Sequence, residues 1–179
     1  HQSCEPTPDQ PVKMPFHIPL AVGLIDEMGE EIKLQLMGAK IEKETKTIIL
    51  NLKDTSHEFI FENVHSENPR LSINRDFSAP VTLSVKQTLP DQAFIVAHDS
   101  DPFNRWAVNQ EYSTNIILDV LSKISTRQSL DLNPAFLNAI GTVINDRKLE
   151  HAFKASLLEL PTENYISTRM EQEDPINLY

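Results

Sequence analysis

The sequence is poor in cysteine and glycine. Its 179 residues include one cysteine, Cys4, and four glycines. A lone thiol cannot build a disulfide framework and offers no multi-cysteine metal site. The glycines are scattered, so the sequence has neither a glycine-rich loop that cradles phosphate nor the Gly-x-Ser-x-Gly turn of many hydrolases. The sequence therefore lacks the signatures of disulfide scaffolds, nucleotide enzymes and serine hydrolases.

Long apolar runs and an excess of positive charge are also missing. No apolar stretch approaches the length of a membrane-spanning helix, and no charged-then-apolar leader opens the chain. The formal net charge is −10 at pH 7, so the chain repels nucleic-acid phosphates and anionic membrane surfaces. We therefore expect no nucleic-acid partner and no membrane partner. The single thiol fits a reducing, cytoplasmic location.

The first half of the chain alternates as strands do. Residues 1–15 are rich in proline and predict an extended lead-in. His17–Ile25 predicts a half-buried strand in which Pro19 favours an edge position. A turn at 26–30 followed by alternation to Leu36 predicts a hairpin. Further strands are predicted at Thr47–Leu52, His57–Asn63, Leu71–Ile73 and Val81–Lys86.

These six short strands, separated by polar turns, predict an immunoglobulin-like β-sandwich over residues 1–89. The cysteine–tryptophan–cysteine signature of a true immunoglobulin domain is absent. The predicted fold class is therefore β plus α in series, because the apolar spacing changes at Pro90 from two residues to three or four.

Residues 90–179 predict the start of an α-helical array, with a short helix over Asp91–His98 and four more after it. The long helix begins at Asp101-Pro102 and buries one apolar stripe. The stripe comprises Trp106, Gln110, Ser113, Ile116, Ile117, Val120, Leu121 and Ile124. Asn133-Pro134 starts a helix with Phe136, Leu137, Ile140 and Ile144 inside, Leu149, Phe153, Leu157 and Leu160 belong to the next, and Thr162 caps a short one holding Tyr165, Ile166 and Met170.

The end of the chain predicts a truncated domain. The last helix pair has no partner to bury its stripe against, if nothing follows it. Asp174-Pro175 has the form of a helix cap and first helical position, yet four residues remain after it. We therefore expect the chain to be a piece of a longer protein.

His98, Asp99 and Asp101 form the tightest cluster of chemically useful side chains. An imidazole with two carboxylates could hold a divalent cation. We favour a structural interpretation, because a helix C-terminus stabilises a histidine cation and Asp101 is a typical helix N-cap.

Other candidates also have structural interpretations. His57-Glu58 begins a zincin-like motif, but Phe61 stands where its second histidine belongs. The paired carboxylates lie in predicted turns and at helix ends, which gives no reason to place them in a dry cleft. Arg105-Trp106 could stack on a ligand ring. We favour an anchor with the indole buried and the guanidinium on a carboxylate or carbonyl.

Three segments carry a family resemblance: PTPDQPVKMPFHIPLAVGLID at Pro6–Asp26, HEFIFENV joined by RLSINRDFSAPVTLSV within His57–Val85, and AHDSDPFNRWAVNQ at Ala97–Gln110. Together they resemble the bacterial alanyl aminopeptidase branch of the aminopeptidase N family of zinc peptidases. The Asp-Pro-Phe-Asn-Arg-Trp motif is the most specific. Ala107-Val108 departs from the family pattern of an acidic residue followed by alanine.

The resemblance implies a parent enzyme with an N-terminal β-domain, a thermolysin-like zinc domain, a small β-sandwich and a large helical domain. This chain matches the sandwich and the first helices. The family's Gly-x-Met-Glu-Asn and His-Glu-x-x-His motifs are missing. The resemblance therefore transfers no catalytic or metal residue, and zinc is implied in the parent only.

The resemblance favours one hypothesis: a non-catalytic fragment of a cytosolic zinc aminopeptidase that removes N-terminal residues from peptides. Its partners are then the missing catalytic and helical parts, and the parent's substrates are peptides. The joint between sandwich and helices is expected at His98, Asp99, Asp101, Phe103, Arg105 and Trp106. Two alternatives remain: a free-standing adaptor that binds a peptide at an open sheet edge, such as the Pro19 strand, and a small metalloenzyme built on the His98 cluster.

Overall fold

The computed structural model describes residues 1–39 and 45–170. The chain divides into two compact units, His1–Ser84 and Val85–Tyr179. In chain order the elements are β1 (Ile18–Ile25), β2 (Gln35–Leu36), β3 (Ile48–Leu52), β4 (Phe61–Glu62), β5 (Arg70–Ile73), the 3₁₀ helix η1 (Arg75–Phe77), α1 (Leu89–His98), α2 (Pro102–Ser125), α3 (Pro134–Asn145), α4 (His151–Leu158) and α5 (Glu163–Ser167). The first unit holds the strands and the second holds the α-helices.

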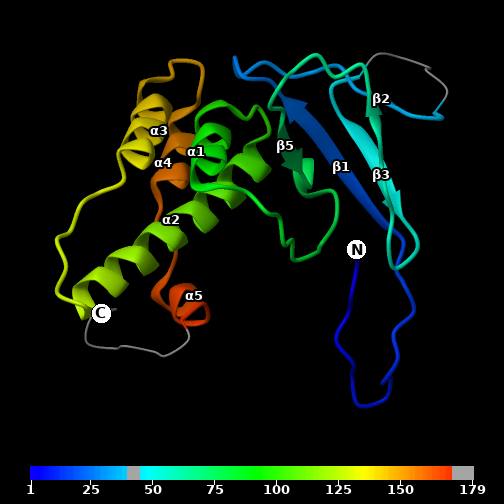
Figure 1. Ribbon diagram of the computed structural model, residues 1–179, viewed down its shortest axis with the longest axis horizontal. Coiled ribbons are helices and arrows are strands. Elements are labelled where there is room, and N and C mark those ends of the chain that lie inside the picture. Colours follow the sequence, from blue (N-terminus) through cyan, green and yellow to red (C-terminus); the bar gives the residue numbers. More distant parts are fainter. Residues whose placement is uncertain (40–44, 171–179) are drawn as a thin grey trace. The chain divides into compact units, whose positions relative to one another are not determined.

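Strand β1 is the central strand of an antiparallel sheet with the order β3–β1–β5 (Figure 1). The expected edge position for the Pro19 strand is therefore wrong. β3 pairs with residues 18–22 of β1, whereas pairing with β5 starts only at Val22. The missing N–H of Pro19 thus removes no bond to β5. The adaptor hypothesis proposed this strand as the open sheet edge for a peptide, and β1 does not provide that edge.

A second sheet, β2–β4, completes a sandwich. The buried core contains Leu20, Val22, Leu50 and Ala79. Side chains from both sheets pack against it, among them Leu36 of β2 and Phe61 of β4. The alternating apolar residues of β1 and β3 therefore face the core, as their period of two requires.

The opposite face of β1 is also covered, so the expectation of a half-buried strand is wrong. Every residue from Leu20 to Ile25 is buried. The segment after β5 covers this second face: the guanidinium of Arg75 lies against Gly23, and the Ser78 hydroxyl accepts a 2.8 Å hydrogen bond from the Ala21 amide.

Three predicted strands are shorter, differently paired or absent. The turn at 26–30 forms and is followed by a bridge between Ile25 and Glu31, but the chain then turns away, and β2 pairs with β4 instead of with β1. The strand predicted at His57–Asn63 is reduced to β4. Residues 81–86 form no strand and pair with no strand of the described part of the chain. Alternation alone cannot supply a pairing partner.

In the helical unit, helix boundaries follow local capping residues. α1 begins two residues before the predicted start, because Thr88 and Asp91 form a reciprocal capping box. The side chains of Asp101, Asn133 and Thr162 cap α2, α3 and α5. The core joins α1, α2, α3 and α4 through nine buried residues: Ala93, Ile95, Val96, Val108, Tyr112, Ile116, Ala139, Val143 and Leu157.

The buried stripe of α2 differs from the predicted one. Trp106 is 39% exposed and Ile124 is 36% exposed. Ser113 and Ile116 of the predicted stripe are buried, but the helix also buries residues outside that stripe: Asn104, Arg105, Val108, Asn109, Tyr112 and Thr114. Several of these side chains are polar and bind main-chain carbonyls, which a search for apolar spacing does not detect.

Three further apolar residues predicted inside helices are exposed. Leu137 and Ile144 of α3 are each 51% exposed, and Leu160, which follows the end of α4, is 61% exposed. Leu149 precedes the first residue of α4, and Met170 follows α5. The helix start predicted at Asp174-Pro175 lies outside the described residues. Within the described ranges, no helix combines the length and hydropathy that crossing a membrane requires.

Candidate functional site

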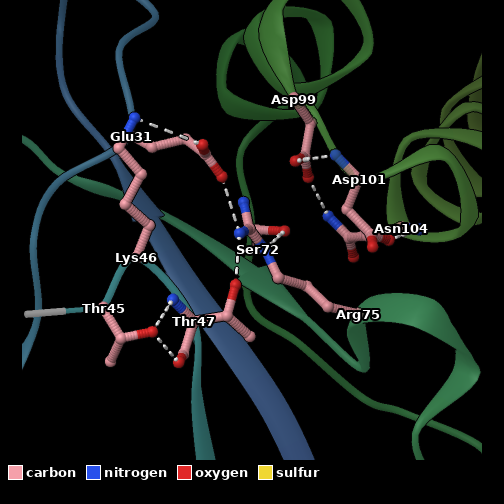
Figure 2. Close-up of polar contacts among 9 residues, drawn as sticks. All are labelled: Glu31, Thr45, Lys46, Thr47, Ser72, Arg75, Asp99, Asp101 and Asn104. Carbon is pink, nitrogen blue, oxygen red and sulfur yellow. Dashed lines mark hydrogen bonds and ion pairs between the residues drawn. The ribbon is translucent and has the colours of Figure 1, made fainter. Parts of the chain in front are cut away.

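The connection between α1 and α2 is held by two carboxylates. Asp99, only 1% exposed, accepts a 2.9 Å hydrogen bond from the Asp101 amide and a 2.6 Å bond from the side-chain amide of Asn104. The Asp101 carboxylate is the N-cap of α2 and accepts a 2.7 Å hydrogen bond from the backbone N–H of Asn104. Figure 2 shows the three side chains joined in this way. The carboxylates therefore fix the direction in which α2 leaves α1.

Arg105 reaches back from the first turn of α2 to the end of α1. Its Nε donates to the carbonyl of Val96 at 2.6 Å and its Nη2 to that of Ala97 at 2.7 Å. The residue is 4% exposed. Burial lowers the pKa of Arg105, and the carboxylates of Asp146 and Asp99 oppose this shift. An arginine remains protonated under all these influences, so a fixed positive charge caps α1.

Only one half of the anchor expected at Arg105-Trp106 forms. The guanidinium binds carbonyls, as expected, but the indole of Trp106 is not buried. Its ring lies 6.2 Å from that of Phe103, in a tilted arrangement. Adjacent residues of a helix point about 100° apart, so burying Arg105 turns Trp106 towards the helix surface.

A charged imidazole at His98 is disfavoured at the end of α1. Its partial burial and the nearby charge of Arg105 lower the pKa of its imidazole. The ring lies 4.6 Å from that of Phe94. Arg105 already supplies the positive charge at the end of α1, so a second one is disfavoured.

The metal interpretation of the His98 cluster is not supported. Asp99 and Asp101 direct their oxygens to N–H donors of the α1–α2 connection, and metal coordination would compete for the same lone pairs. Across residues 1–39 and 45–170, no three His, Cys, Asp or Glu side chains form a group that could hold a metal ion. The described residues therefore do not fit the zinc that the family resemblance implies for a parent enzyme.

A second polar cluster, in the β-unit, was not found from the sequence. Arg75, 5% exposed, donates from Nε to the Ser72 hydroxyl at 2.8 Å, and from Nη1 to Glu31 at 2.7 Å and to the Thr47 hydroxyl at 2.8 Å. Figure 2 shows these groups around the guanidinium. The three partners come from β5, from the segment after β1 and from the residue before β3, so only the fold brings them together.

The backbone beside Arg75 is strained. Asn74, Asp76 and Phe77 have φ of 59°, 53° and 49°, a region that bulky residues rarely occupy. The Asn74 side chain holds the turn by accepting from the Ala79 amide at 2.8 Å and donating to the Ala79 carbonyl at 3.0 Å. The strain is compatible with a structural role, because it aims Arg75 at the covered face of β1.

Two domain-family models match the chain. Residues 1–86 match the domain of unknown function DUF3458, described as an Ig-like fold. Residues 90–179 match the domain of unknown function DUF3458_C, described as ARM repeats. The predicted fold class, an immunoglobulin-like sandwich followed by a helical array, is therefore confirmed.

Curated relatives of similar sequence are aminopeptidases. Aminopeptidase N of Escherichia coli (strain K12) is 32% identical over 170 residues, which cover 95% of this chain and 19% of that protein. Aminopeptidase N of Haemophilus influenzae is 27% identical over 174 residues, 97% of this chain and 19% of that protein. The chain belongs to the aminopeptidase N family, and it spans about a fifth of the length of these relatives.

A solved structure has the same fold. The crystal structure of Legionella pneumophila aminopeptidase A in complex with aspartic acid matches 90% of this chain and 17% of its own, with a TM-score of 0.63. The sequence identity is 23%. At this identity the match describes the fold alone.

Proposed function

We propose that this chain is the non-catalytic connecting part of a zinc aminopeptidase. In the parent, the sandwich links the catalytic part to a helical domain whose first helices are α1 to α5. The parent releases N-terminal amino acids from peptides in the cytoplasm. The zinc and the catalytic groups belong to regions of the parent outside these 179 residues.

One observation carries this proposal. The chain aligns over 95% of its length with an aminopeptidase N, yet accounts for 19% of that protein. A segment of this size, with one small sandwich and five helices, is suited to a supporting role. The absence of a metal-holding group from residues 1–39 and 45–170 is consistent with that role.

The α1–α2 connection supports a rigid link. Asp99, Asn104 and Arg105 are each less than 5% exposed. The Asn104 side chain donates to Asp99, and Arg105 donates to the carbonyls of Val96 and Ala97, through hydrogen bonds of 2.6 to 2.7 Å. Buried charge-assisted bonds of this kind leave little freedom for two helices to rotate. We propose that this stiffness fixes α2 relative to α1 at the start of the helical domain of the parent.

The test is hydrolysis of a chromogenic alanyl amide by the purified 179-residue chain with zinc supplied. We expect no turnover above background and no zinc retained after gel filtration. E. coli aminopeptidase N, a relative named as an aminopeptidase, serves as the positive control. Turnover that a chelator abolishes and zinc restores would contradict the proposal.

A further inference from the structure

Helix α3 carries no charged residue. Its sequence is PAFLNAIGTVIN, from Pro134 to Asn145. A helix on the surface of a globular unit normally presents charged side chains on the face away from the core, whereas a helix that is apolar all round is covered on all sides. The polar residues of α3, Asn138, Thr142 and Asn145, recur at i, i+4 and i+7 on one face, so any other exposed face of α3 is uncharged and apolar.

In the described unit, only one face of α3 is covered. Ala139 and Val143 are 4% and 0% exposed and belong to the helical core. Leu137 and Ile144 are each 51% exposed. Together with Ile140 and Gly141 they recur at i, i+3, i+4 and i+7, which places them on a single face. We call these four residues the outer stripe.

Gly141 lies in the middle of the outer stripe, where helix stability alone disfavours a glycine. A Cβ built on it meets no atom within 4 Å in the described structure. Nothing among the residues of this unit up to Met170 therefore requires its small size. A glycine on a helix surface allows another backbone to approach closely.

We propose that the outer stripe is the docking surface for a helix of the next repeat in the parent, supplied by polypeptide outside these 179 residues. This inference rests on the proposed function. Residues 90–179 match a domain described as ARM repeats, and such repeats bury their apolar faces on adjacent repeats. The aminopeptidase N relatives have about four-fifths of their length outside the matched region. Because the outer stripe has no charged residue, we expect its partner to be the apolar face of a helix.

The discriminating experiment is Gly141→Ala made both in the 179-residue chain and in the polypeptide encoded by the complete reading frame. In the short chain the new methyl group enters open space and favours the helix, so Tm rises by about 4 °C. In the complete polypeptide the methyl group meets the docked helix, so Tm falls. A rise in both proteins overturns the proposal, as does a reading frame that encodes no further helices.

A charge on the outer stripe gives a second, independent measurement. Leu137→Lys leaves hydrogen exchange of the α3 amides in the short chain within twofold of the original, but raises it at least tenfold in the complete polypeptide. Asn138→Lys is the matched control, because it adds the same charge to an exposed position of α3 outside the stripe; it leaves exchange unchanged in both. Equal exchange in Leu137→Lys and Asn138→Lys overturns the proposal.

A second copy of the chain is the competing candidate for the partner of the outer stripe. If the complete polypeptide is a dimer at micromolar concentration and Leu137→Lys makes it a monomer, a second copy covers the stripe and the proposal is overturned. The same experiments test the proposed function independently of the docking surface. A complete polypeptide that shows the Tm reversal but does not hydrolyse alanyl amide retains the docking surface and contradicts the aminopeptidase assignment.

Discussion

The guanidinium Nε of Arg105 donates a 2.6 Å hydrogen bond to the carbonyl oxygen of Val96, near the end of α1. The last carbonyls of a helix have no partner within that helix. Arg105 therefore satisfies a group that burial would otherwise leave unpaired, and it joins α2 to α1 by a charge-assisted bond.

Arg105→Ala is expected to destabilise the helical unit by about 3 kcal/mol, because it removes two charge-assisted bonds and leaves buried carbonyls unsatisfied. Arg105→Lys is expected to recover part of the loss, since an ammonium group can reach one carbonyl but cannot bind two in the planar geometry of a guanidinium. Urea unfolding monitored by the fluorescence of Trp106, the single tryptophan of the chain, measures this unit specifically.

The matched control is Arg169→Ala. Arg169 pairs with Glu111 at 3.3 Å across an exposed surface, where ion pairs contribute less than about 1 kcal/mol. Equal losses for Arg105→Ala and Arg169→Ala would show that the α1–α2 connection does not depend on the buried guanidinium.

Gly23→Ala is expected to disrupt the β-unit. The added Cβ would lie within 2.7 Å of three guanidinium atoms of Arg75. Arg75 cannot simply move away, because Ser72, Glu31 and Thr47 hold it. We expect a loss of about 2 kcal/mol, typical of overpacking. Faster hydrogen exchange of the β1 amides measures it, since the only tryptophan lies in the other unit.

A double substitution separates steric conflict from other causes. Arg75→Ala removes the side chain that Cβ would meet, so Gly23→Ala should cost less in the Arg75→Ala background than in the original chain. An equal cost in both backgrounds would exclude contact between these two residues as the reason.

Local features of the sequence predicted the structure well. The caps Asp101, Asn133 and Thr162 were predicted because a helix start needs a side-chain acceptor at one position, whatever the rest of the chain does. The strand at Thr47–Leu52 was predicted from its period of two. Thr88 was missed, although Thr-x-x-Asp before an apolar run is a readable signal.

Non-local features could not be predicted in the same way. Residues 81–86 alternate like a strand, but only the fold determines whether a neighbouring strand is available. The stripe of α2 was misplaced because its buried side includes the polar residues Arg105 and Asn109. Their burial depends on partners and packing in other helices, such as the carbonyls of Val96 and Leu157.

Glu27 is expected to titrate far below an ordinary glutamate. The backbone amide of Asn68, followed by the backbone amide of Glu27 and the Ser66 hydroxyl, lowers the pKa of Glu27 to about 2. The Asn68 backbone amide and the Ser66 hydroxyl each donate a 2.9 Å hydrogen bond to the Glu27 carboxylate. Because the folded pKa is depressed below 4.5, this carboxylate stabilises the fold above about pH 4.5, and its contribution is lost as the pH falls towards 2.

A carboxyl-carbon NMR titration checks this value directly. Ser66→Ala should raise the pKa of Glu27, since one donor to the charged form is removed. Ser3→Ala is the control, because Ser3 is exposed and lies far from Glu27 in the sequence; it should leave the titration unchanged. A titration midpoint near 4.5 in the original chain would show that these hydrogen bonds do not stabilise the charged carboxylate.

Asn109 holds the end of α4. Its side-chain amide, 1% exposed, donates a 2.6 Å hydrogen bond to the Leu157 carbonyl. Asn109→Asp replaces this donor with a carboxylate oxygen that faces the carbonyl, and leaves a buried charge without compensation. We expect the helical unit to lose about 4 kcal/mol at pH 7, in the range for an unpaired buried charge.

The pH dependence of Asn109→Asp distinguishes charge from shape. Burial and the facing carbonyl raise the pKa of the introduced carboxyl, so it takes up a proton more readily in the folded state than in the unfolded state. Its destabilising effect should therefore shrink as the pH is lowered from 7 to 5, where the protonated acid can donate to Leu157.

Gln110→Glu, one residue further along α2, is the control. Gln110 donates to the Glu159 carbonyl from an exposed position, so the introduced charge stays hydrated and the loss of stability is small. Urea unfolding followed by Trp106 fluorescence at both pH values decides the matter, and a loss for Asn109→Asp that does not change with pH would exclude the buried charge as its cause.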